Sequence, residues 1–169
     1  PSIFSWQIAN EPRAFSEENK PAFAAWIKSV AVEIKSLDKN HLVSTGSEGK
    51  HGCEEDIHLF GLIHSYPEID YMNIHIWPYN WGWIKKDSLT EDEKRAEINT
   101  MNYIEEHLKY AREYKKPLVI EEFGYPRDGF EFTPGSGVSA RNKYYRSLFS
   151  LILENKKNRG VIAGCNFWA

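Results

Sequence analysis

The strict alternation of apolar segments with segments of helical periodicity is the feature that most constrains the fold of this chain. Parallel strands need a long crossover between them, so this alternation predicts an α/β fold with a parallel sheet and covering helices. The expected strands are residues 2–9, 41–49, 70–78, 117–123 and 161–168, and the expected helices are 20–36, 54–64, 91–114 and 139–155. The first strand, SIFSWQIA, is almost continuously apolar, which predicts burial on both faces.

Polar and aromatic residues gather where the apolar segments end. These residues are Asn10-Glu11, Glu48, His75 to Trp77, Glu121-Glu122 and Trp168. A closed parallel barrel carries its chemistry at the carboxyl ends of its strands. No GxGxxG or Walker sequence follows any strand, so the dinucleotide-binding and phosphate-loop versions of a parallel sheet are not expected.

The composition limits the class of protein further. A chain of 169 residues with 41% hydrophobic and 27% charged residues suits one globular domain with a sizeable core. A net charge of −3 gives no footprint for nucleic acid, and no apolar run reaches the roughly 20 residues that span a bilayer. Aromatic residues make up 14%, which indicates a heavy core or faces that stack on flat ligands. Trp6 and Trp26 fall in core patterns and are expected to be packed inside.

Two strand ends carry glutamates, in WQIANEPR and in PLVIEEFG. Retaining hydrolysis of a β-glycosidic bond uses two carboxyl groups about 5 to 5.5 Å apart. One protonates the leaving oxygen and later activates water, while the other attacks the anomeric carbon. The positions alone do not assign these two roles, and helix capping or ion pairing remains the alternative for each glutamate.

The alternation of side chains along a strand makes two further predictions. Only one of Glu121 and Glu122 is expected to face the cleft, because neighbouring side chains point to opposite faces of a strand. The pattern does not choose between them. Asn10 and Glu11 can both reach the cleft only if the chain bends or bulges there.

The motifs NEPR, HIWP, EEFGYPRD and the closing FW resemble the second half of a glycoside hydrolase family 5 enzyme, most of all its endo-β-1,4-mannanase branch. The resemblance covers essentially the whole chain and strands four to eight of the eight in that family. It implies a (β/α)8 TIM barrel for the parent enzyme. It also implies that residues 1–169 form a single, partial catalytic domain that is truncated at both ends. We therefore expect the chain by itself to lack activity.

The resemblance implies roles for the matching residues. Glu11 would be the acid/base, and Glu122, the second of the adjacent pair, would be the nucleophile. Asn10 would donate a hydrogen bond to the 2-hydroxyl of the sugar. His75 would orient the acid/base or contact the sugar, although a histidine at a strand end is more often structural.

Four tryptophans are expected to bind substrate. Trp168 would form the platform under the reacting sugar. Trp77 stands where many relatives carry a tyrosine that hydrogen bonds to the nucleophile, and its indole N–H can donate but cannot accept. Trp81 and Trp83 would extend the platform or, as an equal alternative, anchor their loop. At the rim of the cleft, ion pairs are the favoured interpretation for Glu48 and Arg127.

The function implied is a retaining endo-β-1,4-mannanase acting on mannan, glucomannan or galactomannan. The alternatives are a β-1,4-glucanase of the same fold and a non-catalytic carbohydrate-binding fragment. A barrel metallohydrolase would need clustered histidine ligands, and His75 stands alone, so no metal and no cofactor are expected. The family implies an extracellular, periplasmic or cell-surface location. The oligomeric state is left open.

Overall fold

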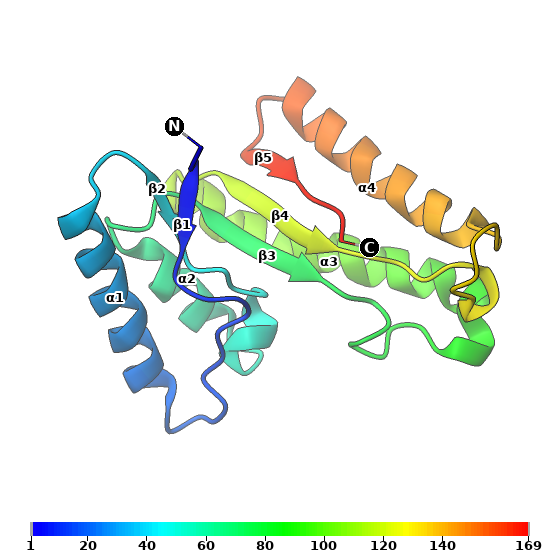
Figure 1. Ribbon diagram of the computed structural model, residues 1–169, viewed down its shortest axis with the longest axis horizontal. Coiled ribbons are helices and arrows are strands. Elements are labelled where there is room, and N and C mark those ends of the chain that lie inside the picture. Colours follow the sequence, from blue (N-terminus) through cyan, green and yellow to red (C-terminus); the bar gives the residue numbers. More distant parts are fainter. Residues whose placement is uncertain (1, 169) are drawn as a thin grey trace.

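The computed structural model describes residues 2–168, in which five strands and four α-helices alternate in the predicted order (Figure 1). The strands are β1 (Ser5–Gln7), β2 (Leu42–Ser44), β3 (Met72–Ile76), β4 (Leu118–Phe123) and β5 (Ile162–Cys165). The helices are α1 (Lys20–Leu37), α2 (Ile57–Ser65), α3 (Leu89–Tyr114) and α4 (Ser139–Lys157). No helix in the described range is long and apolar enough to cross a membrane.

All strand pairs are parallel, but they form two sheets. One sheet contains β1 and β2, and the other has the order β3-β4-β5. Between β2 and β3 the ladder is replaced by two backbone hydrogen bonds, Asp70 N–H to Val43 O (2.9 Å) and His75 N–H to Glu48 O (3.2 Å). The Asn73 side chain fills the space between these bonds, and we call this junction the seam.

Asn73 completes the seam by hydrogen bonding on both sides of its amide. Its oxygen accepts from Gly46 N–H (3.2 Å), and its amide nitrogen donates to Ser47 O (3.0 Å). Asn73 is fully buried, as are both of these partners. A side chain thus substitutes for the missing backbone ladder and satisfies polar groups that would otherwise be buried without partners.

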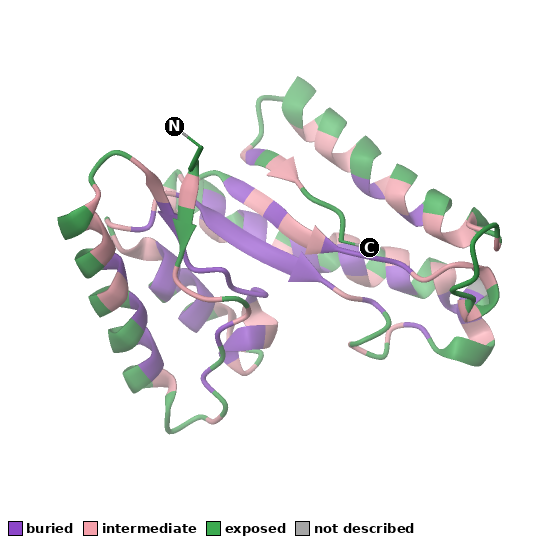
Figure 2. Ribbon diagram, viewed as in Figure 1, coloured by how far each residue is buried: buried purple, intermediate pink, exposed green. Residues whose placement is uncertain are grey.

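The core lies between the strands and the helices. Neighbouring helices pack against one another in chain order, α1 on α2, α2 on α3 and α3 on α4. Every residue of β3 is buried, and Figure 2 shows this strand in the middle of the molecule with the exposed residues on the outer helix faces. Buried apolar side chains from several elements, including Phe60, Ile74, Ile120 and Leu148, form one main cluster.

The prediction that the first strand is buried on both faces is wrong. β1 has only three residues, of intermediate to full exposure (Figure 2). Trp6 is 39% exposed and donates its indole N–H to Asp38 (2.9 Å), and Trp26 is 43% exposed, so neither is a core residue. The physical reason is that β1 has one strand neighbour, β2, within residues 2–168, and no other described element covers its second edge.

Candidate active site

Glu11 enters the site through a sharp bend that follows β1. Its backbone lies in the left-handed region (φ 48°), where residues other than glycine are uncommon. Its N–H donates to Gly46 O (2.9 Å), which holds the bend against the loop after β2. Asn10 and Glu11 both line the same hollow, so the bend that the alternation of side chains requires is present.

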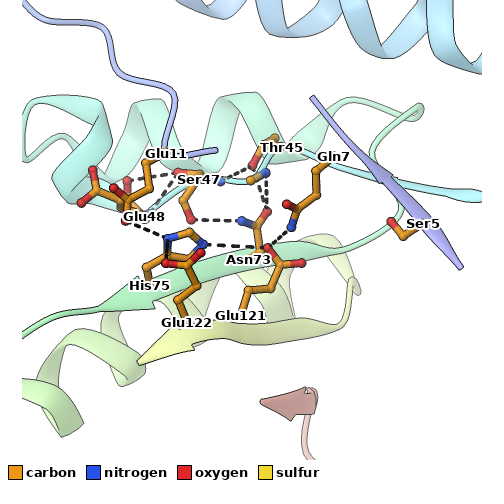
Figure 3. Close-up of polar contacts among 12 residues, drawn as sticks. Ser5, Gln7, Glu11, Thr45, Ser47, Glu48, Asn73, His75, Glu121 and Glu122 are labelled. Carbon is orange, nitrogen blue, oxygen red and sulfur yellow. Dashed lines mark hydrogen bonds and ion pairs between the residues drawn. The ribbon is translucent and has the colours of Figure 1, made fainter. Parts of the chain in front are cut away.

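Only Glu122 lines the cleft, as predicted for one member of the pair, but Glu121 and Glu122 lie on the same side of β4 and not on opposite faces. The register passes from Ile74 opposite Ile120 to His75 opposite Glu122, so Glu121 is the extra residue of a β-bulge. Figure 3 shows both side chains rising from β4 toward β3. The side chains do not alternate here because Glu121 is an extra residue without a partner on β3, so Glu122 points to the same side as Glu121.

The environments of the two glutamates differ. The Glu122 side chain is 20% exposed and lines the hollow. The Glu121 side chain is 9% exposed, and it accepts hydrogen bonds from the Tyr71 hydroxyl (2.9 Å) and from the Gln7 amide. Burial raises the pKa of Glu121, and the hydrogen bond from Tyr71 opposes that rise. Glu122 is therefore the member of the pair that a ligand could reach.

His75 joins the two candidate carboxylates. Its Nδ1 lies 3.0 Å from Glu11 Oε1 and 3.4 Å from Glu122 Oε2 (Figure 3). Nδ1 and one oxygen of each glutamate all lie within 4.8 Å of one another. The ring is almost completely buried, with a side-chain exposure of 2%, and its Nε2 faces Glu121 at 4.0 Å.

The three donor atoms of Glu11, His75 and Glu122 are also close enough to share one metal ion. A cation at this position would occupy both carboxylates. It would therefore compete with any reaction that needs one carboxyl group protonated and the other free.

Glu48 and Arg13 form an ion pair at the edge of the site. Arg13 Nη2 lies 2.7 Å from Glu48 Oε2, and the Glu48 side chain is only 2% exposed. Burial raises the pKa of Glu48, the nearby charge of Glu11 raises it further, and Arg13 opposes both effects. The ion pair expected for Glu48 is confirmed. Sequence reasoning missed its partner, although Arg13 follows Glu11 by two positions in NEPR.

Arg127 forms no ion pair with any other residue in the range 2–168, so that expectation is wrong. Its guanidinium donates instead to the carbonyl of Ser136 (3.1 Å), within the loop that precedes α4. Arg127 thus helps to hold this loop together, while the carboxylate of the next residue, Asp128, accepts from the backbone N–H groups of Ser139 and Ala140 at the start of α4.

These side chains surround a hollow of about 720 Å³, which we call the cleft. Its lining contains Asn10, Glu11, Arg13, Glu48, His51, Trp77, Asn80, Trp81, Glu122 and Trp168. Six of the eight predicted site residues are in this lining. His75 lies beneath it in contact with both glutamates, and Trp83 lies outside it.

Trp77 and Trp168 form the aromatic wall on the Glu122 side of the cleft, and a glycine allows their approach. A Cβ atom on Gly124 would lie 2.5 Å from Cζ3 of Trp77 and 3.2 Å from the carbonyl oxygen of Trp168. The Trp168 backbone N–H donates to Phe123 O (2.9 Å), and the residue as a whole is 62% exposed. The glycine of EEFG therefore creates room for the wall directly after Glu122.

Trp81 and Trp83 lie in the loop after β3 and take different positions. Trp81 lines the cleft, and its ring centroid lies 4.6 Å from that of His51. Trp83 packs edge-on against Trp81 at 5.0 Å and lies 6.1 Å from Tyr103 of α3. Trp83 thus anchors the loop to α3, while Trp81 faces the cleft.

The arrangement is suited to acid/base and nucleophilic chemistry on a neutral, partly apolar ligand. Two carboxylates face each other across one histidine, and an aromatic wall stands beside them. One oxygen of Glu11 lies within 4.8 Å of one oxygen of Glu122, which is closer than the roughly 6.5 to 9.5 Å that leaves room for a water molecule between two carboxyl groups.

Comparison with protein-family models gives one family, described as "GH family 5 beta-mannosidase-like", whose model matches residues 1–169. Mannan endo-1,4-beta-mannosidase 4 of Solanum lycopersicum is 30% identical over 177 residues, and the match covers 99% of this chain and 42% of the relative. Mannan endo-1,4-beta-mannosidase 3 of Arabidopsis thaliana is 29% identical with the same coverage. The chain thus spans about two-fifths of the length of the curated relatives that it matches.

Solved structures show the same likeness in three dimensions. A glycoside hydrolase family 5 mannosidase from Rhizomucor miehei matches with a TM-score of 0.86 and 32% identity, over 99% of this chain and 39% of that one. The endo-1,4-beta-D-mannanase of Thermotoga petrophila matches with a TM-score of 0.72 and 27% identity, over 99% and 46% of the two chains. The five strands and four helices therefore have the fold of strands four to eight of a (β/α)8 barrel.

Proposed function

Because this chain belongs to glycoside hydrolase family 5, in the group described as β-mannosidase-like, we propose that its protein hydrolyses β-1,4-linked mannans with retention of anomeric configuration. The observation that carries the proposal is the approach of Glu11 and Glu122 to within 4.8 Å across His75. That spacing leaves too little room for a water molecule between an inverting pair. Direct attack by one carboxylate is the chemistry that remains.

In the proposed reaction, Glu122 attacks the anomeric carbon while Glu11 protonates the oxygen of the leaving sugar. This gives a covalent glycosyl–enzyme intermediate. Glu11, now ionised, then takes a proton from a water molecule, whose oxygen attacks the same carbon and releases Glu122. The assignment of the two roles follows the family motifs NEPR and EEFG.

The remaining cleft residues would hold the sugar. His75 Nδ1 is close enough to both glutamates to donate to the one that is ionised at each step. Trp77 and Trp168 would pack against the apolar C–H face of the reacting sugar, and Asn10 would hydrogen bond to its 2-hydroxyl. None of these contacts requires a metal ion or a cofactor.

The substrate class follows from the relatives. Several curated relatives are named mannan endo-1,4-beta-mannosidases, which favours an endo-acting enzyme on mannan, glucomannan or galactomannan. A β-1,4-glucanase is the alternative within the same chemistry, because the glucose units of its substrate differ from mannose units only in the configuration of the 2-hydroxyl. An exo-acting β-mannosidase is a second candidate. It is favoured by the higher TM-score of the Rhizomucor mannosidase, 0.86 against 0.72 for the Thermotoga mannanase.

The proposed site of action is outside the cytoplasm, in the extracellular space, in the periplasm or at the cell surface. A polymeric mannan does not enter a cell intact, so its hydrolysis has to begin there. Localisation of the tagged protein by cell fractionation tests this point. Recovery with the cytoplasmic fraction alone would contradict it.

The roles of the two glutamates are tested with substrates whose leaving groups differ. In the complete protein, Glu11→Gln should lower hydrolysis of mannan by about 10² to 10⁴-fold. The same variant should still form the glycosyl–enzyme from a dinitrophenyl β-mannoside, whose leaving group needs no proton. Glu122→Gln should lose both reactions. If Glu122→Gln keeps turnover on the activated substrate, the assignment of the nucleophile is wrong.

The substrate and the mode of attack are tested by product analysis. An endo-acting enzyme should release mannobiose and mannotriose early from mannohexaose, whereas an exo-acting enzyme should release mannose from one end. Cellohexaose at the same concentration serves as the gluco-configured control. NMR of the first product should show the β-anomer, and the α-anomer would overturn the retaining mechanism.

A further inference from the structure

A second hollow adjoins the cleft between the loop after β3 and the middle of α3. It has a volume of about 390 Å³, which lies within the range of small-ligand sites, and we call it the loop–helix hollow. His51 and Trp81 line both this hollow and the cleft, so the two spaces are neighbours that share a wall. A chain of sugars in the cleft could therefore continue into the second hollow.

The loop–helix hollow has aromatic walls. Trp81, Trp83 and Tyr103 pack mutually edge-on or tilted, with ring centroids 5.0 to 6.1 Å apart. Both tryptophans are half-buried and contribute to the lining. The apolar C–H face of a sugar ring packs well against such indole faces.

The ionisable side chains around the hollow are paired with one another. Lys50 Nζ lies 2.7 Å from Glu106 and 4.0 Å from Glu55, and His51 Nδ1 lies 2.5 Å from Glu55. Among the described residues, each of these four ionisable side chains already has a partner in the lining. The hollow consequently presents no unpartnered ionisable side chain to an ionic ligand and is suited to a neutral one.

Unpaired polar groups complete the lining. Asn99 and Asn102 are three positions apart on α3, so they share one face of the helix. Among the described residues, neither amide has a hydrogen-bond partner, nor do the indole N–H groups of Trp81 and Trp83. These groups provide donors and acceptors for hydroxyl groups beside an aromatic face.

We infer that the loop–helix hollow is an additional subsite for one neutral hexose unit of the substrate held in the cleft. The inference rests on the proposed function and extends it, since it predicts that the enzyme binds beyond the cleaved bond on the Trp81 side. The hexose could belong to the main chain or to a side branch of a substituted mannan. Both have the same ring and hydroxyl chemistry.

The experiment measures binding in the absence of turnover. Glu122→Ala in the complete protein is titrated calorimetrically with mannobiose, with linear mannohexaose and with a galactosyl-substituted mannooligosaccharide. Adding Trp83→Ala should weaken binding of a ligand that reaches the hollow by about tenfold and leave mannobiose unchanged. Weakening of the linear ligand indicates a main-chain unit, and weakening of the substituted ligand alone indicates a branch. Trp26→Ala, an exposed tryptophan on α1, is the matched control.

A second variant protects the test against misfolding of Trp83→Ala. Asn102 is exposed on α3, so Asn102→Ala should leave the fold intact and still weaken the same ligands by several-fold. Equal affinities for Asn102→Ala, Trp83→Ala and Trp26→Ala with all three ligands would overturn the subsite while leaving the proposed function standing. Failure of the parent variant to bind any ligand, together with a wild-type protein inactive on mannan, would overturn the proposed function and the subsite with it.

Discussion

Glu121 and Glu122 show how one bulge gives two neighbouring carboxylates separate tasks. Both side chains lie on the same side of β4, but Tyr71 and Gln7 hydrogen bond to Glu121 and burial raises its pKa. Glu122 remains open to the cleft beside His75. Hydrogen bonding and exposure, rather than the direction of the side chain, therefore leave Glu122 as the member of the pair that is open to the cleft.

Replacing each glutamate in turn tests this selection. Glu122→Gln should lower kcat on mannan by at least about 10³-fold, because it removes the nucleophile. Glu121→Gln keeps an oxygen that accepts from Tyr71 and should lower kcat by no more than about tenfold. Steady-state kinetics on soluble mannan give both values. Comparable losses in the two variants would show that Glu121 takes part in the chemistry.

The buried histidines His64 and His107 are held in their neutral forms. His107 Nδ1–H donates to Tyr103 O (2.7 Å), which leaves Nε2 to accept from the backbone N–H of Lys50 (2.8 Å). Burial lowers the pKa of His107 to about 3 and the pKa of His64 to about 4. A proton on His107 Nε2 would break this hydrogen bond from Lys50, which lies between the cleft residues Glu48 and His51.

These lowered pKa values predict acid-sensitive stability. The unfolded chain takes up protons on both histidines near pH 6.5, whereas the folded chain does so only near pH 4 and 3. The free energy of unfolding should be highest above pH 6.5 and fall by several kcal/mol (about 3 for His64 alone) as the pH drops toward 4. Urea titrations between pH 7 and 4 measure this slope. The slope should shrink in His107→Gln, and an unchanged slope would contradict the assignment.

At the residue scale, the sequence predicted which residues form the site better than it predicted where their side chains point. Glu11, Glu122 and His75 were identified from strand ends and family motifs, and the structure brings them together. The common direction of Glu121 and Glu122 was not predicted, because a bulge depends on the register with β3 and not on the sequence of β4 alone. Arg13 was missed because its partner Glu48 is distant in sequence.

At the scale of elements, local signals located the helices closely. The expected helix 20–36 is α1, Lys20–Leu37, and the expected helix 139–155 is α4, Ser139–Lys157. The start of α2 moved from residue 54 to Ile57, because Glu54 and Glu55 have left-handed backbones (φ 56° and 59°). Asp56 then caps the helix. β1 was predicted too long because an apolar run shows a preference for burial but not the neighbours that provide it.

Asp56 gives a test at this scale. Its carboxylate accepts from the N–H groups of His58 (2.9 Å) and Leu59 (3.1 Å), and it also pairs with Lys20 of α1 (3.1 Å). Asp56→Ala should lower the free energy of unfolding by about 1 kcal/mol, because α2 loses its N-cap. Asp56→Asn is the matched control. It keeps the cap and loses only the charge, so it should cost less in the same urea titration, and equal costs would assign the effect to the Lys20 pair.

At the scale of the whole molecule, the seam between the two sheets is the main departure from a continuous barrel wall. The predicted alternation of strands and helices gave the order of the strands but not this interruption. The reason is that the sequence of β3 contains Asn73 but does not show which groups of the neighbouring segment its amide will bind. The loop–helix hollow escaped prediction for a similar reason, since Asn99 and Asn102 resemble solvent-facing residues of an amphipathic helix.

Asn73 carries the prediction that belongs to the whole molecule. Asn73→Ala would leave Gly46 N–H and Ser47 O buried without these partners, and should lower the free energy of unfolding by about 3 kcal/mol. Asn73→Asp keeps the acceptor for Gly46, but it buries a carboxylate whose second oxygen faces the Ser47 carbonyl, so its loss at pH 7 should be at least as large. Thermal or urea unfolding compares the two variants. A loss below about 0.5 kcal/mol for Asn73→Ala would show that the backbone bonds alone hold the sheets together.

The seam also has a stereochemical consequence. Glu11 follows the last residues of one sheet, whereas His75 and Glu122 belong to the other, so the gap between the two carboxyl groups spans the seam. Retaining and inverting hydrolysis differ in that gap by only about 1 to 4 Å. Under the proposed function, the choice between a covalent intermediate and a single displacement by water therefore depends on how firmly the backbone hydrogen bonds of the seam and the buried Asn73 amide hold the two sheets in place.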